Sequence, residues 1–125
     1  MNRIVVYGTL KTGTRKTDFV KGYLYDLGAY PAIILDKNGT LIEVEIAQVD
    51  DVMLQYFDVY EGYHGKNNSK NLYNRVKTKT TNGNTVYIYE FANKKLLKEK
   101  VSPMIPSQNS KVVSWKNTKM LWEVM

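Results

Sequence analysis

The chain has 125 residues, 43% hydrophobic and 12% aromatic, which suits one globular domain and disfavours a mainly disordered chain. It has no cysteine and one histidine, His64, so disulfides and thiolate chemistry are excluded and a histidine-rich metal cluster is disfavoured. The net charge of +6 comes from 18 Lys and Arg residues scattered along the chain, which favours a solvated surface over a nucleic-acid-binding patch. No membrane-length apolar run and no signal-peptide pattern occurs, so we expect a soluble, cytoplasmic protein.

The first informative stretch is Arg3 to Thr14, which reads RIVVYGTLKTGT. Its apolar segment Ile4–Tyr7 predicts a buried strand that stops at Gly8. The loop that follows carries a second glycine, Gly13, and small hydroxyl residues, so its backbone N–H groups can turn toward an anion or a carbonyl. Two interpretations stay open: the floor of a pocket, or an ordinary turn after a strand.

Further β-favouring segments follow along the chain. They are Phe19–Asp26, Tyr30–Leu35, Thr40–Val49, Leu72–Thr80 and Asn84–Phe91. The turn cluster Asp36–Gly39 predicts a hairpin between the second and third of these segments. The pair Asn82-Gly83 predicts a hairpin between the last two. From Val86 to Tyr89 aliphatic and tyrosine side chains alternate, and the pattern does not decide which pair faces inward.

A helix is predicted over Asp51–Glu61, where apolar residues recur at helical spacing. Asp50 is the expected N-cap, and Gly62 is expected to take the left-handed conformation that ends a helix. The basic stretch Lys94–Lys100 is compatible with a further helical turn.

The C-terminal stretch Val112–Met125 is weakly amphipathic. We expect it to dock on the rest of the fold through Val113, Trp115, Leu121 and Trp122.

The end of the predicted helix carries the carboxylates Asp58 and Glu61, three residues apart and therefore on one face. Glu61 also lies in the last turn, where the helix dipole disfavours negative charge. Both effects raise a carboxylate pKa, which would suit a general base. The alternative is a solvated glutamate at a helix terminus.

Four short motifs then occur in a fixed order: VYGTLK from Val6, YPAI from Tyr30, FDVYEGY from Phe57 and LYNR from Leu72. A degenerate C-terminal element, Ile105–Ser107 followed by Trp115, comes after them. The ordered set resembles the γ-glutamylcyclotransferase-like family, in particular its small bacterial, γ-glutamylamine cyclotransferase and AIG2-like branch.

The resemblance implies an α+β fold, in which residues 1–125 form a single domain built as a mixed β-barrel with a few flanking helices and a central cavity. It also implies an enzyme that cyclises a γ-glutamyl amide to 5-oxoproline and releases an amino acid or amine. Glu61 would be the catalytic acid/base. No metal or organic cofactor is implied.

The substrate-binding residues carried over by the resemblance lie in two motifs. They are Tyr7, Gly8, Thr9 and Leu10 of YGTL, followed by Lys11, and Tyr73 and Arg75 of the YxR pattern. Backbone N–H groups from Gly8 to Lys11 would receive the glutamyl carboxylate or the developing oxyanion. Arg75 would pair with a substrate carboxylate, although an exposed cross-strand charge fits it too.

Two other functions remain open at this point. A catalytically silent member of the same fold would bind or sequester a small ligand or nucleotide in the cavity. A nucleic-acid-binding domain would use the basic surface and the ten tyrosines, and the scattered charge disfavours it. For the cyclotransferase and for the silent member alike, the expected partner is a small molecule. The oligomeric state is not predicted.

Overall fold

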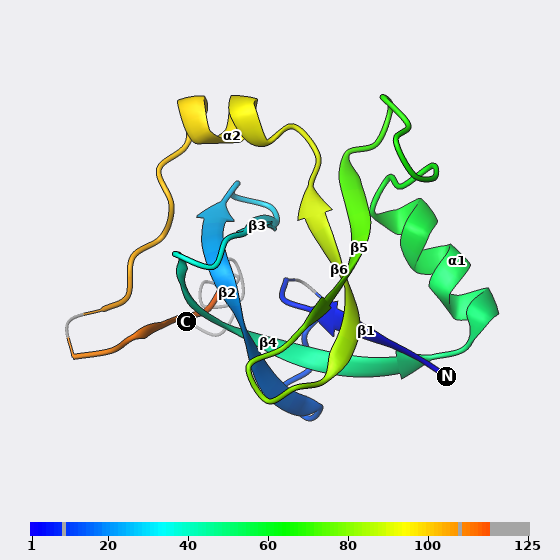
Figure 1. The fold of residues 1–125 in the computed structure, drawn as a ribbon, viewed down its shortest axis with the longest axis horizontal. Helices are drawn as coiled ribbons and strands as arrows, with labels where there is room; N and C mark the ends of the chain where they lie inside the picture. Colours follow the sequence, from blue (N-terminus) through cyan, green and yellow to red (C-terminus); the bar gives the residue numbers. More distant parts are fainter. Residues whose placement is uncertain (9, 108, 116–125) are drawn as a thin grey trace, which may run out of the picture.

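The computed structural model describes residues 1–8, 10–107 and 109–115 (Figure 1). Their elements are, in chain order, β1 (Asn2–Val6), β2 (Lys16–Asp26), β3 (Pro31–Leu35), β4 (Thr40–Val49), α1 (Asp51–Tyr60), β5 (Tyr73–Lys79), β6 (Thr85–Phe91), α2 (Lys94–Lys100) and β7 (Val112–Val113). The predicted strands and helices are therefore all present, with ends that differ by a few residues.

The strands form one mixed sheet in the order β3-β2-β4-β1-β6-β5, with β7 paired to β4. β1 runs parallel to β6 and β7 runs parallel to β4, while the other pairs are antiparallel. The ten-residue strand β4 joins the two halves of the sheet, because Thr40–Ile46 pairs with β2 and Glu45–Val49 pairs with β1. The sheet curves into a half-barrel (Figure 1), which confirms the predicted α+β fold with flanking helices.

Both faces of β1 are buried, as expected for the run of β-branched residues that it contains. Val5 faces the interior of the half-barrel, where it joins a cluster that includes Ile33, Ile42 and Ile88. Ile4 and Val6 alternate to the other face and pack with Leu54 of α1. Phe57, nearer the end of α1, packs against the same cluster, so the C-terminal end of α1 lies near the end of β1.

One predicted pairing is wrong, because β3 and β4 do not form a hairpin. Residues 36–39 do turn, with the Gly39 N–H donating to the Asp36 carbonyl at 3.0 Å, but both flanking strands pair with β2. β2 has eleven residues, enough for β3 along Gly22–Asp26 and for β4 along Lys16–Gly22. Gly22 permits this junction, since a Cβ there would lie 2.3 Å from the Ile34 carbonyl oxygen.

The predicted hairpin between β5 and β6 is confirmed. Its turn is closed by the Thr80 N–H, which donates to the Asn84 carbonyl at 2.9 Å, and Gly83 takes a φ of +84°. On β6 the side chains of Val86, Ile88 and Tyr89 are all buried. Burial therefore includes residues from both faces of the strand and not one alternating pair alone.

The C-terminal part of the described chain docks as expected. Val113 and Trp115 are 4% and 3% exposed and join the interior cluster of the half-barrel. The predicted contacts of Leu121 and Trp122 lie outside the described residues. Within the described ranges, no helix is long and apolar enough to cross a membrane.

Candidate active site

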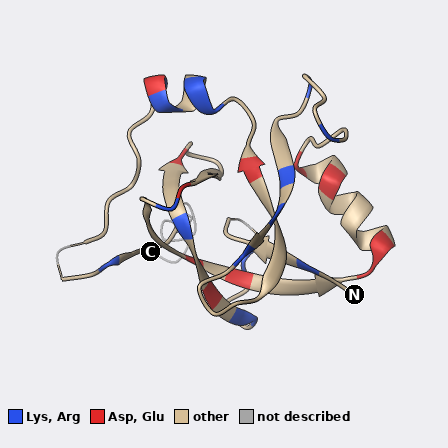
Figure 2. Ribbon diagram, in the orientation of Figure 1, with Lys and Arg blue, Asp and Glu red and all other residues tan. Residues whose placement is uncertain are grey.

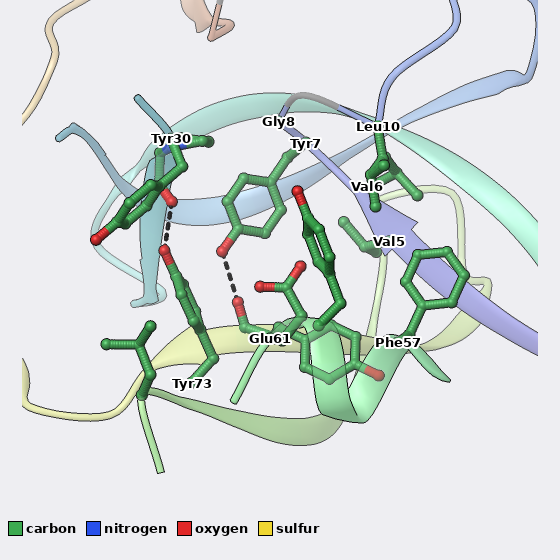
Figure 3. A pocket seen from close by; sticks show the side chains of 13 residues that line it. Val5, Val6, Tyr7, Gly8, Leu10, Tyr30, Phe57, Glu61 and Tyr73 are labelled. Atoms are coloured by element: carbon green, nitrogen blue, oxygen red, sulfur yellow. Dashed lines mark hydrogen bonds between the residues drawn. The ribbon is translucent and has the colours of Figure 1, made fainter. Parts of the chain in front are cut away.

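A cavity of about 200 Å³ opens where five elements meet: the ends of β1 and β6, the starts of β3 and β5, and the C-terminal end of α1 (Figure 3). Its lining consists of Val5, Val6, Tyr7, Gly8, Leu10, Tyr30, Pro31, Phe57, Tyr60, Glu61, Leu72, Tyr73 and Tyr89. Glu61 is the one side chain of the Asp, Glu, Lys, Arg or His type in this lining among the described residues. The cavity is therefore mostly apolar and aromatic around a single carboxylate.

The way in which α1 ends fixes the position of Glu61. Asp50 caps the start of the helix by accepting the Met53 N–H at 2.8 Å, and Glu61 is the C-cap residue. Gly62 follows with a φ of +67°, and its N–H donates to the Val59 carbonyl while the Tyr63 N–H donates to the Asp58 carbonyl. These two bonds define a Schellman motif, so the predicted left-handed glycine is confirmed. The chain turns away immediately after Glu61, and the Glu61 side chain projects into the cavity (Figure 3).

Burial among apolar and aromatic groups raises the pKa of Glu61 to about 7. The predicted direction is confirmed, but the cause is loss of hydration rather than repulsion from Asp58. Within the described part of the chain, no group donates a hydrogen bond to the Glu61 carboxylate. A carboxylate that is unpaired and half protonated near neutral pH can both accept and donate a proton.

The three tyrosines of the inner cavity are committed to structural hydrogen bonds. The Tyr7 hydroxyl donates to the Tyr89 carbonyl at 2.6 Å, and the Tyr73 hydroxyl donates to the Pro31 carbonyl at 2.7 Å (Figure 3). The Tyr89 hydroxyl donates to Asp58 at 2.7 Å. Burial raises the pKa of all three phenols, so they remain protonated at neutral pH. Their hydroxyl groups therefore shape the cavity and are not ionised at neutral pH.

The loop after β1 forms another wall of the cavity through Gly8 and Leu10. Glycine is required at position 8 by close approach, because a Cβ there would lie 2.8 Å from Cδ of Pro31. No described residue accepts a hydrogen bond from the backbone N–H of Gly8 or Leu10, whereas the Lys11 N–H donates to the Gly8 carbonyl at 3.0 Å. Thr9 lies outside the described residues.

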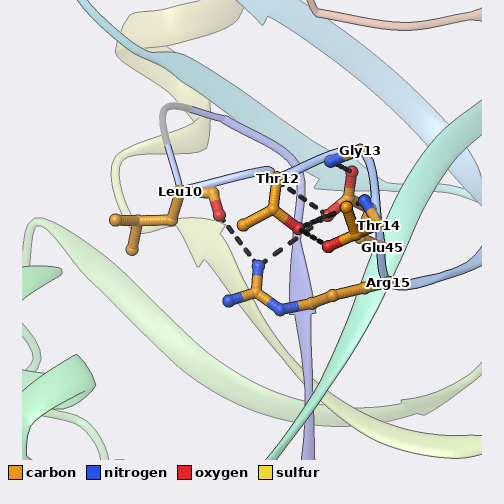
Figure 4. Close-up of polar contacts among 6 residues, drawn as sticks. All are labelled: Leu10, Thr12, Gly13, Thr14, Arg15 and Glu45. Atoms are coloured by element: carbon orange, nitrogen blue, oxygen red, sulfur yellow. Dashed lines mark hydrogen bonds and ion pairs between the residues drawn. The ribbon is translucent and has the colours of Figure 1, made fainter.

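Farther along, the same loop does hold an anion, and that anion is the chain's own Glu45 (Figure 4). The backbone N–H groups of Thr12 and Gly13 donate to its two carboxylate oxygens at 3.0 and 2.8 Å. Arg15 lies 3.7 Å from the same carboxylate and donates to the Leu10 carbonyl. The loop after β1 therefore combines the two alternatives that its sequence left open. Gly8 and Leu10 line the cavity, and Thr12 and Gly13 form a structural turn around Glu45.

Two of the expected substrate-binding side chains are engaged elsewhere. The Lys11 ammonium donates to the Ser114 hydroxyl and the Trp115 carbonyl, at 3.0 and 3.1 Å. Arg75 pairs with Asp58 at 2.7 Å and lies against the rings of Tyr63 and Tyr87. Neither side chain belongs to the cavity lining.

Several lining residues were not assigned to the site from the sequence. They are Val5, Val6, Tyr30, Pro31, Phe57, Tyr60, Leu72 and Tyr89. Most lie within the four ordered motifs, next to residues that were assigned, so the motifs themselves were the available signal. Tyr89 lies in the last strand, where alternation alone left its direction open.

Charged groups elsewhere are dispersed. Lys and Arg occur on β2, β5, α2 and the segment after α1 rather than on one element (Figure 2). Among the residues that the structure describes, no three His, Asp or Glu side chains gather as a metal site. The cavity itself offers one carboxylate, backbone groups and aromatic walls.

The half-barrel and its cavity occur in a chain whose sequence matches a known family. Residues 4–115 match the family model described as "Gamma-glutamyl cyclotransferase, AIG2-like", and the chain belongs to this family. Members of this family are usually enzymes that bind small-molecule substrates.

Two solved structures share the fold. The uncharacterized protein PH0828 from Pyrococcus horikoshii is 24% identical with a TM-score of 0.52, and the match covers 73% of this chain and 78% of that one. The uropathogenic E. coli-specific protein c4763 is 18% identical with a TM-score of 0.60, covering 82% and 87%. A search of curated proteins finds no significant match.

Proposed function

We propose that this protein cyclises γ-glutamyl amides to 5-oxoproline and releases the amine, with Glu61 as general base and then general acid. The observation that carries the proposal is the Glu61 carboxylate, which accepts no hydrogen bond from a described residue, has a pKa of about 7 and stands in the cavity of a chain that belongs to the cyclotransferase family. An α-ammonium is not a nucleophile until a base removes a proton, and Glu61 is suited to remove it.

The reaction needs no second reactant. After Glu61 accepts a proton, the α-amino nitrogen attacks the γ-carbonyl carbon, and a five-membered tetrahedral intermediate forms. The intermediate collapses by breaking the bond to the leaving nitrogen, which receives the proton from Glu61. The attacking nitrogen also loses a second proton to solvent, and the released amine takes up its second proton from solvent. The α-ammonium therefore loses two protons and the released amine gains two, so the proton count is conserved. Holding the glutamyl chain folded supplies acceleration because the attack is intramolecular.

The remaining groups of the cavity have matching roles. The N–H groups of Gly8 and Leu10, which are unpaired among the described residues, supply donors for the oxyanion or for the glutamyl carboxylate. Tyr7 and Tyr73 form the inner wall and hold its shape through their bonds to backbone carbonyls. Thr9 belongs to the same proposal as part of the YGTL motif.

The test measures 5-oxoproline and free glutamate released from γ-glutamyl amino acids, γ-glutamyl-ε-lysine and glutathione. The expected result is 5-oxoproline from at least one substrate with wild type, and its near-complete loss with Glu61→Gln. Glu99→Gln on α2 is the control, since it makes the same chemical change at an exposed position. Release of glutamate would indicate hydrolysis and contradict the proposal. No release, together with an unaltered ligand that co-purifies, would favour the silent binding member.

A further inference from the structure

The cavity has an inner part and an outer part that differ in exposure. Val5, Tyr7, Tyr73 and Tyr89 are at most 8% exposed and form the inner wall. Four other lining residues form the mouth. They are Leu10, Tyr30, Tyr60 and Leu72, which are 37%, 44%, 62% and 46% exposed.

The size of the cavity determines which part of a substrate it can enclose. Pockets that bury a drug-sized ligand have volumes of roughly 300 to 1,000 Å³, and this cavity has about 200 Å³. Under the proposed function, the α-amine and the γ-carbonyl must both lie near Glu61. The γ-glutamyl group therefore occupies the inner part, and a large amine portion has to lie against the mouth.

The mouth is aliphatic and aromatic, and in the described residues none of its side chains carries a charge. The apolar surface continues along α1, because Tyr56 and Val52 lie one and two turns before Tyr60 and are 67% and 62% exposed. Contact with such a surface favours apolar groups. An ammonium there would lose part of its hydration and meet tyrosine rings, but it would gain no carboxylate partner among the described residues of the mouth.

We infer, on the basis of the proposed function, that the substrates are γ-glutamyl amides whose amine portion is large and apolar. Aromatic and branched or long aliphatic amines fit the mouth best. Amines that carry a second ammonium group fit it poorly. The mouth thus selects the leaving group, while the inner cavity selects the γ-glutamyl group.

A series of four substrates with one common reacting group tests this inference. The γ-glutamyl amides of ethylamine, butylamine, phenethylamine and 1,4-diaminobutane are compared by kcat/KM for 5-oxoproline release. We expect kcat/KM to rise about tenfold or more from the ethylamide to the phenethylamide, and to fall about tenfold from the butylamide to its 4-amino counterpart. The butylamide and the 4-aminobutylamide differ mainly in the terminal ammonium of the second compound.

A matched pair of variants locates the selectivity. Leu72→Glu adds a carboxylate at the mouth, and Val59→Glu adds one on α1 at a side chain that is 80% exposed and outside the lining. Leu72→Glu should reverse the preference between the butylamide and the 4-aminobutylamide, and Val59→Glu should leave it unchanged. Equal rates across the series, or a wild-type preference for the 4-aminobutylamide, would overturn the inference alone. No 5-oxoproline from any amide would overturn the proposed function, and the inference with it.

Discussion

Two partly or fully buried glutamates of this small protein have opposite surroundings. Glu45 is 7% exposed, and its carboxylate accepts N–H groups from Thr12 and Gly13 and lies near Arg15. Glu61 enters the cavity without a hydrogen-bond donor among the described residues, and burial raises its pKa to about 7. The comparison teaches that hydrogen-bond donors let a buried carboxylate hold a loop in place, whereas a carboxylate buried without them has a raised pKa, which is the property that the proposed proton transfer requires.

The largest expected effect comes from removing the Glu61 carboxylate. Glu61→Gln should lower kcat/KM for 5-oxoproline formation by about 10²- to 10⁴-fold, the range typical of a general acid or base. Steady-state assays with a reactive γ-glutamyl amide measure the loss. Circular dichroism spectra that match wild type show that the variant folds. Turnover within a few-fold of wild type would remove Glu61 from the mechanism.

The same substitution should stabilise the folded protein at high pH. The pKa of Glu61 rises from 4.5 to about 7 on folding, so ionised Glu61 opposes folding, and stability falls as pH increases from about 4.5 to 7. At pH 8, Glu61→Gln should raise the free energy of unfolding by about 2 kcal/mol, less than the full shift because the side chain is partly hydrated. Urea denaturation at pH 8 and pH 4 measures the difference, which should vanish at pH 4. An equal effect at both pH values would show that the charge of Glu61 is not responsible.

Removal of the other carboxylate should have the opposite sign. Glu45→Ala leaves the N–H groups of Thr12 and Gly13 without their acceptor, and it should lower the free energy of unfolding by about 1 to 2 kcal/mol. Water replaces part of the lost contact, because both N–H groups belong to exposed residues. Thermal and urea unfolding measure the cost. Unchanged stability would mean that the loop does not depend on this carboxylate.

The smallest effect should come from the glycine that ends α1. Gly62→Ala places a Cβ at a φ of +67° and 3.1 Å from Cβ of Leu72, so we expect a loss of about 1 kcal/mol in stability and a several-fold loss of activity. Gly83→Ala is the control, since it has a φ of +84° with no neighbour within 4 Å and lies in the remote β5–β6 turn. It should cost similar stability without loss of activity. Equal activity losses in both variants would show that the geometry at Gly62 is not special.

Local signals predicted much of this fold. The N-cap at Asp50, the left-handed Gly62 and the β5–β6 hairpin each depend on residues close together in sequence, and each is confirmed. The ordered motifs also brought Tyr7, Gly8 and Leu10 together with Glu61 and Tyr73, which all line one cavity. The family model confirms the resemblance that those motifs carry.

Contacts between distant residues were beyond local signals. The Asp36–Gly39 turn resembled a hairpin loop because nothing nearby shows that the long strand β2 takes both flanking strands as partners. Arg75 is paired with Asp58, which lies 17 residues earlier, and this pairing depends on where α1 docks. Likewise, the Glu61 pKa was expected from the dipole and Asp58, while its actual cause, burial, depends on the assembled cavity.

The most direct test of the central claim is the pH dependence of kcat/KM for 5-oxoproline formation by the wild-type protein between pH 5 and pH 9. This parameter reports the ionisation of the free enzyme, so it should fall about tenfold per pH unit below an apparent pKa of about 7. At higher pH it should reach a plateau, because Glu61 is then ionised and ready to accept the proton. A profile that stays flat from pH 5 to pH 7 would contradict the claim that Glu61, with its raised pKa, is the base.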